Sequence, residues 1–246
     1  SVESRPQYTP ALVRLAGIEA ERFGNLANAL DLAREARRQM PEDPEVAAEA
    51  GKVAYLAGDT AWALSLLSES VRSLENSPEV LYYFALTSYA QGNPTAARKN
   101  INKALSLDAA FTHAEEARLF LDLLNMQTGK IDNAERAQAS VNAALQANPR
   151  DPAALAASAY LSLQSDETDK AVRTYEKILQ LYPDFVPAAA ALARIYARND
   201  ATADRAFELA VKARAAMPED RQLAAVLGRL AYERGQWQYA AGLLEE

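Results

Sequence analysis

The residues that could support catalysis or metal binding are few. The chain of 246 residues contains one histidine, His113, and no cysteine. Imidazole and thiolate are the side chains best suited to proton transfer and to metal binding near neutral pH. The acidic pairs, Glu115 with Glu116 and Glu245 with Glu246, are adjacent in sequence, so the two carboxylates of a pair do not share one helix face. We therefore predict that the chain is not an enzyme and holds no metal.

The lone histidine and the glycines have simpler interpretations. His113 stands where other segments of the chain have a proline at a helix start, which indicates a surface residue at the entry to a helix. A general base or a metal ligand is the alternative interpretation of His113. The glycines fall singly, so no glycine-rich loop is available to hold a phosphate group, and we predict no cofactor.

Composition excludes several classes of protein. Lys and Arg number 26 against 33 Asp and Glu, which gives a net charge of −7, and half of the residues are hydrophobic. This is the composition of an ordered chain rich in helix formers. The acidic balance, with no basic stripe, argues against a nucleic-acid partner. No run of about 18 apolar residues is long enough to span a membrane, and the chain does not open with a signal-peptide pattern.

A regular spacing organises the chain. Gly24, Gly58 and Gly92 lie 34 residues apart. The same spacing separates two further sets of residues, namely Ala29, Ala63 and Ala97, and Pro10, Pro44 and Pro78. A recurrence of this kind predicts a tandem array of one structural unit.

Within one period the apolar residues recur at helical spacing. Between residues 44 and 74 they fall into two groups, Val46, Ala50, Val53 and Ala54, and then Ala63, Leu66, Leu67, Val71 and Leu74. Pro44 suits a first helical turn, Gly58 can take the positive φ of a turn, and Asp59 or Thr60 can cap the next helix. Each period is therefore predicted to be two antiparallel helices that bury their apolar stripes by stacking on the next pair.

These residues resemble the tetratricopeptide repeat (TPR) family. The small residue, glycine, alanine and proline that mark its 34-residue signature correspond to Gly17, Gly24, Ala29 and Pro41 in the first period. The resemblance covers essentially the whole chain. It implies an all-α fold, a right-handed superhelical α-solenoid of about seven tandem helix-turn-helix repeats.

The resemblance also assigns repeat boundaries. The predicted segments are the tail of a preceding repeat at 1–9, followed by repeats at 10–43, 44–77, 78–112, 113–151, 152–186, 187–220 and a truncated 221–246. The fourth repeat is about five residues too long, and either "NMQTGKIDNAE" is an insertion between its helices or its first helix, starting at 113, is longer. We expect the chain to be a segment of a longer array, with Leu243 and Leu244 exposed at its end.

The resemblance places a partner-binding groove on the first helix of each repeat. Carried over position by position, the groove residues are Arg14, Ile18, Arg22, Lys52, Tyr55, Tyr82, Leu86, Tyr89, Leu121, Tyr160, Leu163, Ile195, Arg198, Arg229 and Tyr232. Tyrosine offers a large apolar face and a hydroxyl to a ligand. The alternative is that the tyrosines pack between neighbouring first helices.

The expected function follows from that groove. We predict a scaffold that binds another protein or a peptide segment. Chaperone tails are not expected as ligands, because the asparagine of the family's carboxylate clamp is missing from every first helix. The repeated junction in "RPQYTPAL" and "YPDFVPAA" is also similar to bacterial arrays of exopolysaccharide export. That similarity gives the alternative, a periplasmic scaffold that guides a polysaccharide or docks its modifying enzyme, and favours the periplasm over the cytoplasm.

Overall fold

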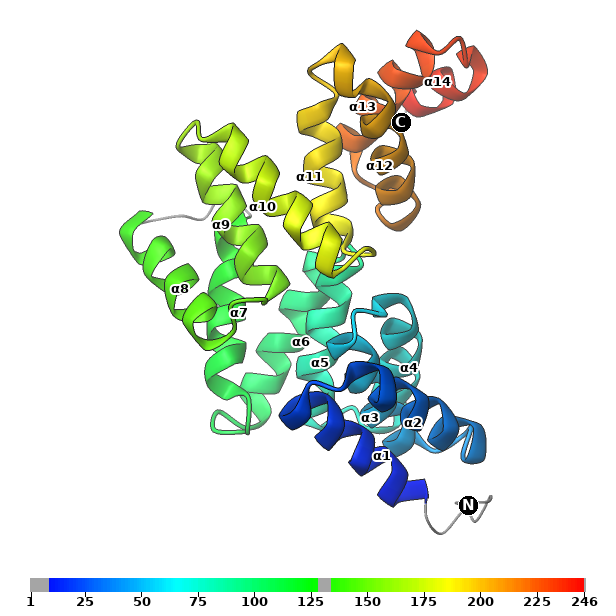
Figure 1. Cartoon of the computed structure of the whole chain (residues 1–246), viewed down its shortest axis with the longest axis vertical. Helices are drawn as coiled ribbons and strands as arrows, with labels where there is room; N and C mark the ends of the chain where they lie inside the picture. The colour runs from blue at the N-terminus through cyan, green and yellow to red at the C-terminus, as the bar shows by residue number, and fades with distance from the viewer. Residues whose placement is uncertain (1–8, 128–133, 246) are drawn as a thin grey trace. The chain divides into compact units, whose positions relative to one another are not determined.

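Helices joined by short turns make up the described part of the structure. The structure is a computed structural model that describes residues 9–127 and 134–245, and within these ranges it contains helices and no strand (Figure 1). The α-helices are α1 Thr9–Ile18, α2 Leu26–Gln39, α3 Pro44–Leu56, α4 Thr60–Ser73, α5 Pro78–Ala90, α6 Pro94–Leu107, α7 Ala114–Gln127, α8 Ala134–Ala147, α9 Pro152–Gln164, α10 Thr168–Leu181, α11 Val186–Tyr196, α12 Ala203–Ala216, α13 Arg221–Glu233 and α14 Trp237–Leu244. A π-helical turn, Glu19–Phe23, extends α1, and a 3₁₀ turn, Asp200–Thr202, precedes α12.

Turn glycines and aspartate caps separate the two helices of a pair. Gly24, Gly58, Gly92 and Gly235 all have positive φ, where a residue with a Cβ would be strained. Asp59 begins α4 by accepting a hydrogen bond from the backbone N–H of Trp62 at 3.2 Å. The predicted turn at Gly58 and the predicted cap at Asp59 are therefore confirmed, because each satisfies a helix end that the chain would otherwise leave unpaired.

A small residue in the first helix lets the second helix of the pair pack closely. A Cβ on Gly51 would lie 2.7 Å from Cγ of Leu67, and a Cβ on Gly228 would lie 2.8 Å from Cγ of Leu244. Both distances are shorter than ordinary Cβ contacts, so a side chain at Gly51 or Gly228 would force the neighbouring leucine to shift. Gly17 differs, because a Cβ there would meet only Oε2 of Glu49 on α3, at an ordinary 3.4 Å.

The helices form two compact units. The first unit comprises Ser1–Tyr89 and Pro94–Leu121, and the second comprises Ala90–Asn93 and Asp122–Glu246. Successive helices pack on one another from α1 to α4 and from α8 to α14, and α1 also contacts α3 while α11 contacts α13. First helices therefore lie against first helices, as the stacking of repeats requires, and the predicted all-α solenoid of consecutive helix pairs is confirmed.

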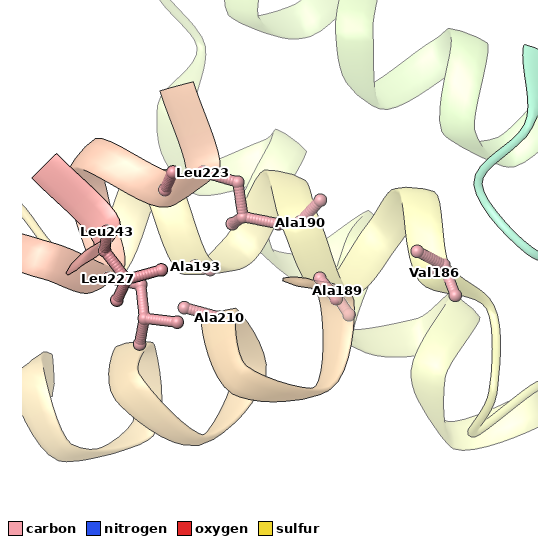
Figure 2. Packing of buried hydrophobic residues seen from close by; sticks show 10 residues of the cluster. Val186, Ala189, Ala190, Ala193, Ala210, Leu223, Leu227 and Leu243 are labelled. Carbon is pink, nitrogen blue, oxygen red and sulfur yellow. The ribbon is translucent and has the colours of Figure 1, made fainter. Parts of the chain in front are cut away.

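The core between pairs is built from small side chains. In the second unit Val186, Ala190 and Ala193 of α11 pack with Ala210 of α12 and with Leu223 and Leu227 of α13 (Figure 2). Alanine on one helix lets leucine of the next approach its backbone, which keeps the interior free of voids.

Two neighbouring leucines at the end of α14 differ in exposure. Leu243 is 7% exposed and belongs to the core cluster of the second unit, so the expectation that it is exposed is wrong. Leu244 is 56% exposed, as expected. The difference arises because Leu243 faces Leu227 and the preceding pair, whereas Leu244 lies beside Gly228 on the flank of α13.

The predicted repeat boundaries agree with some helix starts and fall partly outside the described residues. α3, α5, α9 and α13 begin at residues 44, 78, 152 and 221, the first residues of four predicted repeats. The predicted insertion overlaps residues 128–133, and the predicted tail, residues 1–9, is described only at its last residue, so neither prediction is tested. The seven boundaries and the handedness of the superhelix stay predictions.

Candidate functional site

The predicted groove residues fall into three classes of exposure. Six are exposed, namely Arg14, Ile18, Arg22, Arg198, Arg229 and Tyr232. Six are half-buried, namely Lys52, Tyr55, Leu121, Tyr160, Leu163 and Ile195. Three are buried: Tyr82, Leu86 and Tyr89. The buried three all come from α5, so that helix contributes its side chains to packing, and the exposed residues lie near the two ends of the chain.

A polar network crosses the first helices of the first unit. We call it the first-helix network and define it as Glu21, Glu49, Lys52, Glu79, Tyr83 and His113. Lys52 stands near one end of it, with Nζ at 2.8 Å from Oε1 of Glu21 and at 3.9 Å from Oε2 of Glu49. The side chain of Lys52 is only 12% exposed. Its ammonium group therefore holds the turn after α1 against α3 through contacts that solvent screens only in part.

Tyr83 connects the two halves of the first-helix network. Its hydroxyl donates to Oε1 of Glu21 at 3.5 Å and lies 3.4 Å from Nε2 of His113. On the other side of the imidazole, Nδ1 lies 2.9 Å from Oε1 of Glu79. The network thus runs from the turn after α1, through α3 and α5, to the start of α7, and it joins side chains far apart in the sequence.

Aromatic rings fix the geometry of His113 and Tyr83. The ring of Tyr82 stacks on the imidazole of His113 with centroids 5.0 Å apart and an interplanar angle of 13°. Tyr55 meets Tyr83 edge to face at 6.2 Å, and the ammonium group of Lys52 lies 5.5 Å from the centroid of the Tyr83 ring. These contacts favour the protonated forms of lysine and histidine, because an aromatic face attracts a cation.

Burial and neighbouring charges shift the titration of the first-helix network. Burial raises the pKa of Glu49 above its ordinary value, and the Glu21 and Glu79 carboxylates add to the effect. Burial lowers the pKa of Lys52, but the hydrogen bond to Glu21 and the charge of Glu49 outweigh it, so the net shift is upward. Burial also raises the pKa of Tyr83, so its hydroxyl stays protonated at any ordinary pH.

His113 is the one imidazole of this network. Its contact with Glu79 raises the pKa of His113, burial partly offsets the rise, and the more distant charge of Glu116 adds to it while Lys52 opposes it. The interpretation as a residue at the start of a helix is confirmed, since the His113 carbonyl accepts from the N–H of Ala117 in α7. The side chain is only 21% exposed, so the expected surface position is wrong. Its stack with Tyr82 removes it from solvent.

The corresponding face of the second unit is more open. Arg198, in the turn after α11, is exposed, as is Arg229 on α13. Arg229 donates to the Ala197 carbonyl and pairs with Glu233 at 2.6 Å, so it joins α13 to the end of α11. Within the described ranges Arg198 forms no ion pair. Both arginines therefore lie on exposed surface, and the guanidinium of Arg229 is held by the Ala197 carbonyl and Glu233.

An exposed aromatic pair lies at the far end of the same helix. Tyr232 of α13 is 58% exposed and Trp237 of α14 is 59% exposed. Their rings meet edge to face with centroids 4.8 Å apart. Large aromatic rings left in solvent are rare in repeat packing, because the next helix normally covers them, and such rings are common at binding surfaces.

Two features, a cluster of metal ligands and a membrane-spanning helix, are absent from the described part of the chain. Residues 9–127 and 134–245 contain no cluster of three or more His, Asp or Glu side chains that could coordinate a metal. Each helix in those ranges is too short or too polar to cross a lipid bilayer.

Comparisons with known proteins find similarity to solved helical-repeat structures at low sequence identity. No family model and no curated protein matches it. The structure of pilF from Pseudomonas aeruginosa is 18% identical over 92% of this chain and 98% of that chain, with a TM-score of 0.45. A tetratricopeptide repeat protein from Parabacteroides merdae is 17% identical over 96% and 91%, with a TM-score of 0.42. YrrB, a TPR protein with an unusual peptide-binding site, is 17% identical over 73% and 89%, with a TM-score of 0.41. TPR proteins are thus among the solved structures that this chain resembles.

Sequence reasoning missed most of the first-helix network. Glu49, Glu79 and Tyr83 were not among the predicted groove residues, and His113 was interpreted as an isolated surface side chain. The repeat register did contain a signal for one contact, because Glu79 precedes His113 by one repeat length. Polar residues one repeat apart on successive first helices meet when the repeats stack.

Proposed function

We propose that the chain is a non-catalytic scaffold that binds another protein through the first-helix face of its second unit. The observation that carries this proposal is the exposure of Arg198 in the turn after α11 and of Arg229 and Tyr232 on the adjacent first helix α13. Arginine and tyrosine are the residue types that contribute most to protein interfaces. Here they lie at positions that the family resemblance assigns to the groove.

The chemistry of this face indicates the kind of partner. Guanidinium groups bind carboxylates and backbone carbonyls in paired hydrogen bonds. The half-buried Ile195 and the exposed ring of Tyr232 supply apolar surface between and beside them. A peptide segment or helix that carries acidic and apolar side chains would match both features.

The first unit offers less to a partner at the same repeat positions. Tyr82 and Tyr89 are 7% and 3% exposed, and Lys52 is committed to Glu21. A partner would have to break contacts within the chain before it could use these groups, and that cost would reduce its affinity. On the face of the second unit Arg198 and Tyr232 are exposed, whereas Arg229 would first have to give up its contacts with the Ala197 carbonyl and Glu233.

A polysaccharide partner, with the periplasmic export scaffold that it implies, is the second candidate. The exposed pair of Tyr232 and Trp237 favours it, because sugar rings stack on open aromatic faces. The protein candidate has broader support, since arginines account for two of the three residues that carry it. Trp237→Ala separates the two candidates: glycan binding would lose most of its affinity, whereas protein binding centred on Arg198 and Arg229 would retain it.

The experiment is a comparison of two matched double variants. Partners are captured from the source organism's lysate, identified, and titrated against the purified chain. Arg198→Ala with Tyr232→Ala alters the proposed face, and Arg173→Ala with Tyr239→Ala removes the same residue types from the exposed surface of the second helices α10 and α14. We expect the first variant to weaken binding by about 10-fold or more, the effect of losing one interface hot spot, and the control to change it little. Equal affinities for the two variants would refute the proposal.

A further inference from the structure

The hydroxyl of Tyr83 lies between two acceptors that differ in their response to pH. Oε1 of Glu21 is 3.5 Å from it and Nε2 of His113 is 3.4 Å from it. A phenol has a single proton to donate, so it can satisfy only one of the two acceptors at a time. The two distances are nearly equal, and the protonation state of His113 therefore decides which acceptor the proton faces.

Neutral His113 draws the Tyr83 proton toward itself. Oε1 of Glu79 lies 2.9 Å from Nδ1 in an ion-pair contact without hydrogen-bond alignment, and its negative charge favours the tautomer in which Nδ1 carries the hydrogen. Nε2 is then a lone pair, and it accepts from the Tyr83 hydroxyl. In this state Glu21 keeps its contact with Lys52 but receives nothing from Tyr83.

Protonated His113 reverses the direction of the hydrogen bond. Both ring nitrogens then carry hydrogens, so Nε2 donates to the Tyr83 oxygen. The phenol proton is released from His113 and can be donated to Glu21. The stack with Tyr82 holds the imidazole in place, with centroids 5.0 Å apart, so the exchange needs no movement of the ring.

The groups that face His113 favour this exchange near neutral pH. Glu79, Tyr82 and Tyr83 face it from α5, Glu116 from its own helix α7, and Lys52 from α3. The nearest carboxylate is the one in contact with Nδ1, and its charge raises the pKa of His113 above the ordinary value. The titration of His113 is therefore shifted upward from that of an ordinary imidazole.

We propose that Tyr83 is a pH-controlled tether: when His113 is protonated, the Tyr83 hydroxyl donates its hydrogen bond to Glu21. Acid forms the tether and ties the π-helical turn Glu19–Phe23 to α5, and alkali releases it. The turn forms the end of the first helix of the chain, so the first-helix face of the first unit changes its rigidity with pH. This device acts inside the first unit and is independent of the binding face proposed for the second.

The test follows amide hydrogen exchange in the turn while His113 titrates. In the unaltered chain, we expect protection of the amides of residues 19–25 to rise about 2- to 10-fold on passing below the pKa of His113, the size of one net hydrogen bond. The pKa of His113 is read from its imidazole NMR signals, and exchange rates are corrected for their intrinsic dependence on pH.

Two variants decide the outcome. Tyr83→Phe removes the hydroxyl alone, and we expect it to abolish the pH-dependent protection while His113 still titrates. Tyr55→Phe removes a hydroxyl from the adjacent ring, and we expect the protection to respond to pH as before. A response that survives in Tyr83→Phe would overturn the proposal, as would protection in the unaltered chain that stays constant across the titration. Neither readout requires a partner, so the outcome is separate from that of the binding experiment.

Discussion

The two units use the same positions of the repeat for different purposes. In the first unit the first helices place Lys52, Tyr82 and Tyr89 in contacts with neighbouring helices, and these side chains are largely withdrawn from solvent. In the second unit the equivalent faces of α11 and α13 leave Arg198 and Tyr232 exposed. The difference shows that a groove position becomes available for binding only where the next helix supplies nothing to cover or neutralise it.

Truncation of a groove tyrosine should affect the two units unequally, and this is the largest effect we expect. Tyr82→Ala removes a buried ring that stacks on His113, so it should cost about 3 kcal/mol of the first unit's stability. Tyr232→Ala removes an exposed ring and should cost less than about 1 kcal/mol in the second unit. Urea titration with unit-resolved hydrogen exchange measures both, since a repeat array need not unfold in one step. Similar costs would remove the distinction between the two faces.

Replacing a cationic groove residue should also destabilise the first unit more than the second, by a smaller difference than the tyrosine variants. Lys52→Met removes the ammonium group that lies between Glu21 and Glu49, with Arg14 as the remaining cation near Glu49, and we expect it to destabilise the first unit by about 2 kcal/mol. That figure allows for the partial exposure of both carboxylates. Arg198→Met should change the stability of the second unit by no more than about 0.5 kcal/mol. A destabilised Lys52→Met chain should partly recover in mild acid, where the raised pKa of Glu49 allows that carboxyl to take up a proton.

Stability should depend on pH near neutrality in the first unit only, and this is the smallest effect. The folded chain raises the pKa of His113, so the stabilisation is complete below the pKa of the unfolded chain and is lost as pH rises through the folded pKa. The second unit contains no histidine, because the single one is His113. Unit-resolved exchange between about pH 6 and pH 8 should show the first unit weakening and the second unchanged.

His113→Gln provides the control for this prediction. It removes the titrating group and should flatten the pH dependence of the first unit. A second unit that weakens equally over the same range would mean that the effect has another origin.

The sequence was sufficient for the helix pairs because their signals are local. Gly58 marks a positive φ, Pro44 marks a first helical turn and Asp59 caps the next helix, and each acts within a few residues. The burial of the groove residues could not be predicted from such local signals. Whether Tyr89 is covered depends on Phe120, which meets its ring at 5.7 Å from the following repeat. Such contacts depend on the exact offset between stacked helices, which one repeat does not encode.

Prediction from sequence meets the same limit at the two leucines that end α14. Leu243 and Leu244 were expected to behave alike, yet one is buried and the other exposed. Adjacent residues of a helix point about 100° apart, so the rotation of α14 against α13 decides which of them is covered. That rotation is set by the contact between Leu244 and Gly228, a feature of three-dimensional packing.

The most direct test of the difference between the two units is hydrogen exchange of the chain with and without its captured partner. We predict that binding protects amides along α11 and α13, on the face that carries Arg198, Arg229 and Tyr232, and leaves α3 and α5 of the first unit nearly unchanged. Protection confined to α3 and α5 would contradict the proposal. It would show that the partner breaks the first-helix network in order to bind, and that exposure in the free chain does not identify the binding face.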